Sequence, residues 1–344
     1  MPKICYEHKK FSPEKLELLA RANMVIMNYQ QQGFTLTLRQ LYYQFIANNL
    51  FPQSWANTAG VTNSVQSYNR LGNLISDGRM AGLIDWEAIV DRGRTSYANT
   101  HWARPSQILE ATVKQYAIDR WANQPYYLEV WVEKEALEDV LGRACQPMDV
   151  RFFACKGYTS QSAMWEASQR LVDKLDQGKK VVIIHLGDHD PSGVDMSRDI
   201  EERLSLFCRQ PVPVNRIALN WAQIQQFNPP PNPAKTTDSR YQAYEDKYGT
   251  DSWELDALDP AVLVNLIRKE ILRYRSETLW EAQLAIEERG RTTLDCVVKY
   301  FPDVVEYLRQ RRKMSDEPVV CQQCGAKAGQ RCLCGVGNQG RQLS

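Results

Sequence analysis

The sequence predicts an α/β protein with additional elements at both ends, and three observations support this. From Tyr126 onward, short apolar runs alternate with segments of helical periodicity; the part before it shows helical periodicity alone; and four cysteines cluster near the end. A chain of 344 residues can form two or three domains. We expect a helical domain (1–95), a linker (96–125), an α/β domain with a helical C-terminal extension (126–315) and a cysteine-rich tail (316–344).

Three helices are expected in the first domain. Ser12 is a typical N-cap, Pro13 suits the first helical position, and Gly33 is a typical stop. A second helix begins after Thr35 or Thr37, and a third lies within residues 61–78. The three segments read SPEKLELLARANMVIMNYQQQ, LRQLYYQFIANN and VTNSVQSYNRLGNLISDG.

A small β element is expected after these helices, in the segment MAGLIDWEAIVDRGR. Three helices followed by short strands are typical of a winged helix-turn-helix domain of the CAP-like kind, which binds DNA. One face of the third helix is expected to be apolar: Val61, Val65, Tyr68 and Ile75. The opposite face offers polar side chains that suit phosphates and base edges: Ser64, Ser67, Arg70 and Asn73. We expect Arg70, Asn73 and Lys156 to contact DNA.

The α/β domain is expected to contain four strands with helices between them. The strands are the apolar runs YYLEVWVE, VRFFAC, KVVIIHLGD and VNRIALN. The helices are KEALEDVLGRAC, SQSAMWEASQRLVDKLD and GVDMSRDIEERLSLFC. Strands that alternate with helices form a parallel sheet with helices on its faces. A proline-rich loop, NPPPNPAK, follows, and then a helical extension over residues 259–290.

Three acidic residues are expected at one edge of this sheet. Glu133 ends the first strand, and Asp188 and Asp190 follow the third. Ligand sites in parallel α/β sheets form at the carboxyl ends of the strands, and residues two apart in an extended segment point the same way. Carboxylates are hard oxygen ligands suited to Mg²⁺, so we predict that these three hold Mg²⁺. The simpler alternative is a set of solvated acids at strand ends.

The segments VEKEALEDVL, KGYTSQSAMWEAS and GDHDPSGVDM resemble the TOPRIM domain of type IIB DNA topoisomerase A subunits. The related meiotic double-strand-break proteins share it, and the short Mini-A forms of viruses and plasmids are the most similar. The resemblance covers roughly residues 12–315 and implies a winged-helix domain followed by a TOPRIM domain. In that family a glutamate and the two aspartates of a DxD motif hold Mg²⁺, which corresponds to Glu133, Asp188 and Asp190. Thr159 departs from the family, where proline is expected.

The family's catalytic tyrosine lies four residues after an arginine, and TLRQLYYQF is similar, with Arg39 and Tyr43. An apolar stripe is expected to face the core: Leu38, Leu41, Tyr42 and Phe45. Tyr43 lies off this stripe, one helical turn from Arg39. An exposed tyrosine beside a guanidinium is placed to meet a phosphate, so we expect Tyr43 to be the nucleophile and Arg39 to stabilise charge. Two core tyrosines are the alternative that the pattern leaves open.

The resemblance implies Mg²⁺-dependent cleavage of double-stranded DNA through a 5′-phosphotyrosine intermediate. It also implies a homodimer in which the tyrosine of one protomer acts with the metal of the other. The sequence contains no P-loop, so ATP-driven strand passage would need a separate B-type ATPase subunit. Two alternatives remain: a TOPRIM nuclease that hydrolyses DNA with water, and a DNA-binding dimer without catalysis.

The tail contains Cys-x₂-Cys and, after a short loop, Cys-x-Cys: Cys321, Cys324, Cys332 and Cys334. Four thiolates fit tetrahedral zinc, so we predict a Zn²⁺ site, with a redox pair as the alternative. Nearby Lys and Arg residues favour contact between the tail and DNA, and contact with a protein is the alternative. The other cysteines are scattered and are expected to be buried free thiols: Cys5, Cys145, Cys155, Cys208 and Cys296.

The formal net charge of +1 conceals an asymmetry along the chain. Residues 1–125 carry 13 Lys and Arg against 9 Asp and Glu, residues 126–299 carry 22 against 28, and residues 300–344 carry 7 against 4. Basic ends around an acidic middle suit a protein that grips an anion and holds cations at its centre. No apolar stretch could span a bilayer and no signal peptide is evident, so we expect a cytoplasmic, nucleoid-associated protein, in the host cytoplasm if it is viral.

Overall fold

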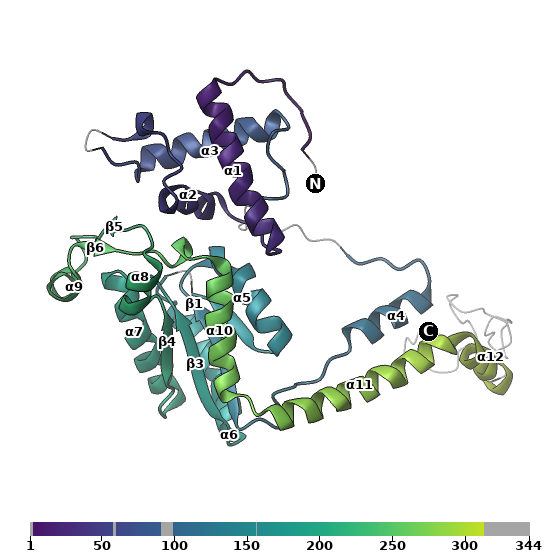
Figure 1. Ribbon diagram of the computed structural model, residues 1–344. Helices are drawn as coiled ribbons and strands as arrows, with labels where there is room; N and C mark the ends of the chain where they lie inside the picture. The colour runs from purple at the N-terminus through teal and green to yellow at the C-terminus, as the bar shows by residue number, and fades with distance from the viewer. Residues whose placement is uncertain (1–2, 58–59, 91–98, 156, 313–344) are drawn as a thin grey trace, which may run out of the picture. The chain divides into compact units, whose positions relative to one another are not determined.

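The structure is a computed structural model that describes residues 3–57, 60–90, 99–155 and 157–312 (Figure 1). It is a mixed α/β protein with a four-stranded parallel sheet, which confirms the predicted class. Among the described residues no helix is both long and apolar enough to cross a membrane.

The chain forms two compact units, one of residues 1–98 and 119–283 and the other of residues 99–118 and 284–344. The first unit begins with α1 (Pro13–Gln31), α2 (Leu38–Ala47), the short η1 (Gln53–Trp55) and α3 (Val65–Met80). The predicted caps of the first two helices are confirmed. The Ser12 hydroxyl accepts from the Lys15 N–H at 3.3 Å, and Thr37 and Gln40 form a capping box.

The buried face of α3 is the expected one only in part, since Ile75 is buried and Tyr68 packs against the core. Val61 and Val65 are 47% and 77% exposed, so the prediction that they face the core is wrong. The buried side instead follows i, i+3, i+4 and i+7 spacing: Leu71, Leu74, Ile75 and Gly78. A Cβ on Gly78 would lie 2.6 Å from Leu19, so α1 packs closely here and selects this face. The buried Ser67, expected on the DNA-facing side, donates to the Trp55 carbonyl of η1 at 3.3 Å.

The β element expected after α3 is much reduced. Two isolated bridges are present in the described part of this region, Cys5 with Ala81 and Leu36 with Ile89. Residues 91–98, which include the end of the expected element, lie outside the described residues. Of the scattered cysteines, Cys145, Cys155 and Cys208 are buried, whereas Cys5 and Cys296 are exposed, which contradicts the prediction for those two.

The parallel sheet has the strand order β2–β1–β3–β4, formed by β1 (Tyr126–Val132), β2 (Arg151–Ala154), β3 (Lys180–Leu186) and β4 (Val214–Ala218). Helices cover both faces. One face packs with α5 (Glu138–Cys145) and α10 (Pro260–Tyr274), and its core includes Val132 and Ile184. The other packs with α6 (Gln161–Asp176) and α7 (Pro191–Cys208), around Trp131 and Ile183. Burial on both faces explains the nearly continuous apolar runs.

Short elements surround the carboxyl ends of the strands: η2 (Glu135–Leu137), α8 (Trp221–Phe227), α9 (Tyr241–Tyr248) and η4 (Leu255–Ala257). Another, η3 (Gln146–Met148), leads from α5 into the start of β2. The proline-rich loop supplies β5 (Asn232–Pro233), which pairs antiparallel with β6 (Asp251–Ser252). A bridge between His189 and Trp253 then fixes the segment after β6 beside the loop that follows β3. The chain from β5 to η4 is therefore part of the strand-end region.

The described part of the second unit is mainly helical. It contains α4 (Pro105–Gln115), the later part of α11 (Glu277–Lys299) and α12 (Phe301–Arg312). Arg291 donates to the Tyr116 carbonyl at 3.1 Å and pairs with Glu287 at 2.9 Å. A Cβ on Gly290 would lie 2.5 Å from the Tyr116 ring, so glycine permits this close approach.

Candidate active site at the carboxyl ends of the strands

Glu133 and Asp188 lie next to each other at the ends of β1 and β3. The two strands are paired in register up to Val132 and Leu186, and the Glu133 N–H donates to the Leu186 carbonyl at 3.0 Å. The Asp188 N–H donates to Glu133 Oε2 at 2.9 Å. The parallel pairing thus brings together two of the three predicted metal ligands, as the positions of the strand ends predict.

Asp190 begins α7 as its N-cap. Its Oδ1 accepts from the Gly193 N–H at 2.6 Å and from the Ser192 hydroxyl at 2.9 Å, and Pro191 occupies the first helical turn. A Cβ on Gly193 would lie only 2.3 Å from the Asp188 carbonyl oxygen. The sequence DHDPSG is therefore a strand-to-helix turn that tolerates only glycine at its last position.

Arg216 on β4 stabilises this turn through hydrogen bonds, a role that the sequence analysis missed. The guanidinium donates to the carbonyl oxygens of Gly187, Asp188 and Gly193 at 2.9, 2.6 and 2.8 Å. Burial lowers the pKa of Arg216, against the opposing effect of the nearby carboxylates. The only signal in the sequence was an arginine inside an apolar strand, where a charged side chain needs several partners.

A lysine occupies the space between Asp188 and two further acids. Lys134 Nζ lies 2.9 Å from Asp188 Oδ2 and 3.1 Å from Asp256 Oδ1, and it also contacts Glu254 Oε2. Asp188 Oδ1 accepts from the Leu255 N–H at 2.8 Å. Glu254 and Asp256, which flank Leu255 on η4, are thus part of the site although the sequence analysis assigned them no role.

The predicted arginine and tyrosine of α2 lie against the same acids. Arg39 pairs with Glu254 at 2.8 Å and with Asp256 at 3.3 Å, and its Cζ lies 5.7 Å from the centre of the Tyr43 ring. The predicted adjacency of Arg39 and Tyr43 is confirmed. One continuous set of ion pairs therefore joins the tyrosine region of α2 to Asp188 at the end of β3.

The two adjacent tyrosines differ in their partners more than in their burial. Tyr43 is only 5% exposed, so the prediction of an exposed side chain is wrong. The proline-rich loop covers it, and its hydroxyl accepts from Asn232 at 3.3 Å. The Tyr42 hydroxyl donates to Asn63 Oδ1 at 2.8 Å and accepts from the Ser64 N–H at 2.8 Å. Tyr42 thus has a structural role, as expected.

The electrostatics of the site reflect crowded carboxylates. Burial, above all, raises the pKa of Glu133, and Asp190 adds repulsion. Burial also raises the pKa of Asp188, with Lys134 opposing the shift and Glu133 reinforcing it. Burial raises the pKa of Tyr43 to about 12, and Glu254 adds to this. The tyrosine is therefore a neutral phenol at pH 7, and the strand-end acids carry an energetic cost when ionised.

The donor set suits Mg²⁺ in kind, because it consists of carboxylates whose mutual repulsion a cation would relieve. Among the described residues, however, no three His, Cys, Asp or Glu side chains gather closely enough to form a metal site. Asp188 is directed to Lys134 and the Leu255 N–H, and Asp190 to the first turn of α7. The joint binding of one ion by Glu133, Asp188 and Asp190 thus stays a prediction.

The two histidines near the acids have structural partners. His185 Nδ1 lies 2.8 Å from the Ser197 hydroxyl, and His189 Nδ1 lies 2.8 Å from the Tyr244 hydroxyl. Burial lowers the pKa of His185 to about 3 and that of His189 to about 4, so both are neutral at pH 7. The rings of Trp221, Tyr244, Tyr248 and Trp253 surround His189.

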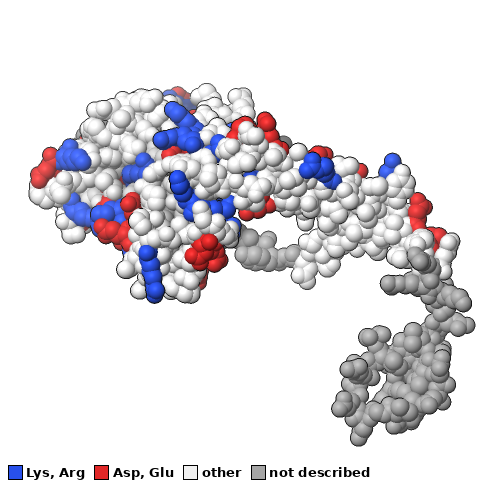
Figure 2. Space-filling view, turned by 90° about the horizontal axis from the view of Figure 1, so that it is seen from below, with Lys and Arg blue, Asp and Glu red and all other residues white. Residues whose placement is uncertain are grey.

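The predicted DNA contacts are exposed where they are described. Arg70 and Asn73 lie on the exposed side of α3, and the Arg70 Cζ is 5.9 Å from the centre of the Trp55 ring. Lys156 lies outside the described residues, as do the predicted zinc ligands Cys321, Cys324, Cys332 and Cys334. Figure 2 shows a face on which basic and acidic side chains are interspersed, so no continuous basic surface is present on the face in view.

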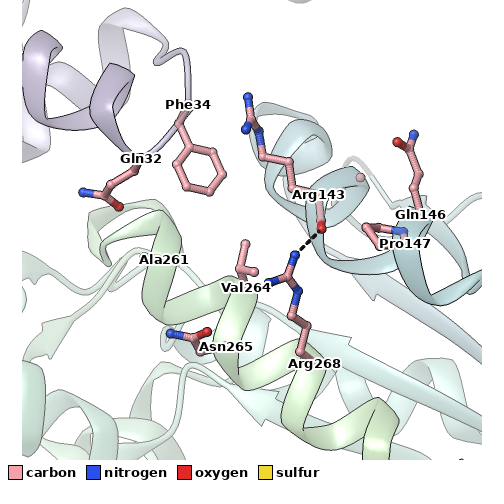
Figure 3. A pocket seen from close by; sticks show the side chains of 10 residues that line it. Gln32, Phe34, Arg143, Gln146, Pro147, Ala261, Val264, Asn265 and Arg268 are labelled. Atoms are coloured by element: carbon pink, nitrogen blue, oxygen red, sulfur yellow. Dashed lines mark hydrogen bonds between the residues drawn. The ribbon is translucent and has the colours of Figure 1, made fainter.

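A separate pocket of about 480 Å³ lies between the end of α1, α5 and α10 (Figure 3). Arg268 donates to the Arg143 carbonyl at 3.0 Å, and the Arg143 guanidinium lies 4.6 Å from the centre of the Phe34 ring. Arg268 thereby satisfies a carbonyl in the last turn of α5. None of the predicted site residues lines the pocket. The contacts of Arg143 and Arg268 give both arginines a structural role.

No family model, no curated protein and no solved structure matches this chain. The arrangement of its side chains is therefore the basis for a functional proposal.

Proposed function

We propose that this protein is a Mg²⁺-dependent DNA-cleaving enzyme that becomes linked to the 5′ end of DNA through Tyr43. In this proposal the N-terminal helices form a winged-helix domain and the parallel sheet forms a TOPRIM domain, as in the A subunit of a type IIB topoisomerase. A single observation carries the proposal. Arg39 and Tyr43 lie against acids that Lys134 joins to Asp188, although α2 and β3 are far apart in the sequence.

Each residue then has a defined task. Tyr43 Oη attacks a phosphorus atom of the DNA backbone, a P–O bond breaks, and the departing 3′ oxygen takes a proton. The products are a 5′-phosphotyrosine and a free 3′ hydroxyl, a reversible exchange of one phosphodiester for another. Arg39 stabilises the charge on the phosphate. Glu133, Asp188 and Asp190 would hold Mg²⁺, which would supply further positive charge. The proton of Tyr43 must leave for a base, because its pKa is about 12.

The proposal includes a homodimer on double-stranded DNA. As the resemblance implies, the tyrosine of one protomer then acts with the carboxylates of the other and leaves the acids of its own chain. Arg39 here pairs with Glu254 and Asp256 of its own chain. A DNA phosphate that reaches Tyr43 must therefore replace these carboxylates as the partner of Arg39. Strand passage driven by ATP is assigned to a separate B-type subunit.

A hydrolytic nuclease is the second candidate, and the burial of Tyr43 favours it. A tyrosine that is 5% exposed and whose pKa is raised to about 12 is also what a structural residue would show. In that mechanism water attacks the phosphate, and no bond forms between protein and DNA.

Mass spectrometry after incubation with duplex DNA and Mg²⁺ separates the two candidates. The proposal expects a nucleotide adduct on the peptide that carries Tyr43, absent in EDTA and in the Tyr43→Phe variant. The Tyr42→Phe variant serves as the matched control and should keep the adduct. Cleaved DNA without any adduct would establish the hydrolytic candidate instead, and no cleavage under either condition would leave DNA binding without catalysis.

A further inference from the structure

Lys134 is the cation of the site that contacts the most carboxylates among the described residues. Its side chain is 15% exposed, and its ammonium contacts three carboxylates from two separate segments, Asp188, Glu254 and Asp256. The lysine follows directly after Glu133, at the end of β1. A single ammonium thus stands where three carboxylate groups converge.

Carboxylates outnumber cations in the site even when Lys134 is counted. Five carboxylates belong to the site: Glu133, Asp188 and Asp190 near the strand ends, and Glu254 and Asp256 in the η4 segment. Three cations accompany them, namely Lys134, Arg39 and Arg216. Arg39 pairs with the two acids of η4, and Arg216 donates to backbone carbonyls of the turn after β3. Lys134 is therefore the cation that the structure places on the Asp188 carboxylate.

We propose that Lys134 is a tethered counter-ion that holds the carboxylates together in the metal-free protein and competes with a divalent cation for Asp188. The inference rests on the proposed function, since it takes Asp188 as a metal ligand. An ammonium and a divalent ion on the same carboxylate repel each other, so the ion must displace Lys134 from Asp188. Glu254 and Asp256 can retain the displaced ammonium, because both already contact it.

Removal of Lys134 should therefore have two opposite effects. The metal-free protein loses stability, because breaking a buried ion pair leaves carboxylates without compensation. The affinity for Mg²⁺ rises, because the competitor and its repulsion are both gone. The Lys134→Arg variant keeps a cation and should retain the affinity of the natural protein.

The test is a calorimetric Mg²⁺ titration of the full chain, without DNA, together with melting curves with and without Mg²⁺. We expect the Lys134→Met variant to bind Mg²⁺ at least about tenfold more tightly than the natural protein. Its melting temperature should be lower without metal and should recover in Mg²⁺. The matched control is Lys269→Met, which removes an exposed lysine of α10 and should change neither measurement.

Every outcome decides the inference. Equal or weaker Mg²⁺ affinity of Lys134→Met, compared with the natural protein, would overturn it and leave the proposed function intact. If neither protein binds Mg²⁺, the metal assignment in the proposed function fails and the inference with it. If Lys134→Met is unfolded without metal, refolding by Mg²⁺ but not by NaCl of equal ionic strength supports the inference. A variant that stays unfolded in both contradicts it.

Discussion

Replacing each of the two adjacent tyrosines with phenylalanine should separate stability from chemistry. Both side chains are 5% exposed, and phenylalanine preserves both rings, so each change removes only a hydroxyl group. The Tyr42 hydroxyl accepts from the Ser64 N–H at 2.8 Å and donates to Asn63 at 2.8 Å. Its loss leaves a backbone donor without a partner, which costs about 1–3 kcal/mol.

The corresponding change at Tyr43 should barely affect folding. The Tyr43 hydroxyl accepts a long hydrogen bond, at 3.3 Å, from Asn232. Its loss should cost about 0.5 kcal/mol or less. The same hydroxyl is the proposed nucleophile, so Tyr43→Phe should abolish the covalent complex with DNA. Tyr42→Phe should still form this complex, although it is the less stable of the two proteins.

The assays are urea denaturation for the free energy of unfolding and a denaturing gel, after incubation with DNA and Mg²⁺, for trapped complexes. The expected pattern is a crossover, with stability lost in one variant and trapping lost in the other. Trapping by Tyr43→Phe but not by Tyr42→Phe would refute the assignment of the nucleophile. Equal stability of the two variants would refute the assignment of a structural role to the Tyr42 hydroxyl.

Three further predictions concern the rest of the site and the tail. The raised pKa of Glu133 means that the folded state binds a proton more tightly than the unfolded state, so metal-free stability should fall as pH rises from about 4.5 toward the raised pKa. Glu133→Gln should reduce this dependence, as measured by melting at pH 5 and pH 8, and an unchanged slope would count against the crowding of carboxylates. Gly193→Ala should destabilise the turn and abolish cleavage, because the added Cβ would lie 2.3 Å from the Asp188 carbonyl oxygen. The control Gly142→Ala should be tolerated, because its Cβ would lie 3.6 Å from the nearest atom. Equal unfolding curves for the two variants would contradict this prediction. Metal analysis should find about one zinc per chain, lost on replacement of Cys321 and Cys324, and zinc-free protein prepared without chelator would remove the predicted site.

Local features of the chain were predictable because they depend on neighbours in sequence. Ser12 with Pro13 and Thr37 with Gln40 specify helix starts through hydrogen bonds that span three residues. The apolar run at 181–184 predicted a buried strand, and the positions of Glu133 and Asp188 at strand ends followed from the α/β alternation.

The tertiary structure decided what depends on packing between distant segments. The inward face of α3 follows from its close approach to α1, which no periodicity in α3 alone reveals. The burial of Tyr43 comes from a proline-rich loop almost 190 residues later in the chain (the hydrogen bond to Asn232 spans 189 positions). The roles of Glu254 and Asp256 also depend on distant segments. They join the site only because the chain after β6 returns to Asp188 and Lys134. Sequence thus determined which residues end each strand, whereas only the folded chain determined which charges meet there, because ion pairs form between side chains that topology brings within a few ångströms.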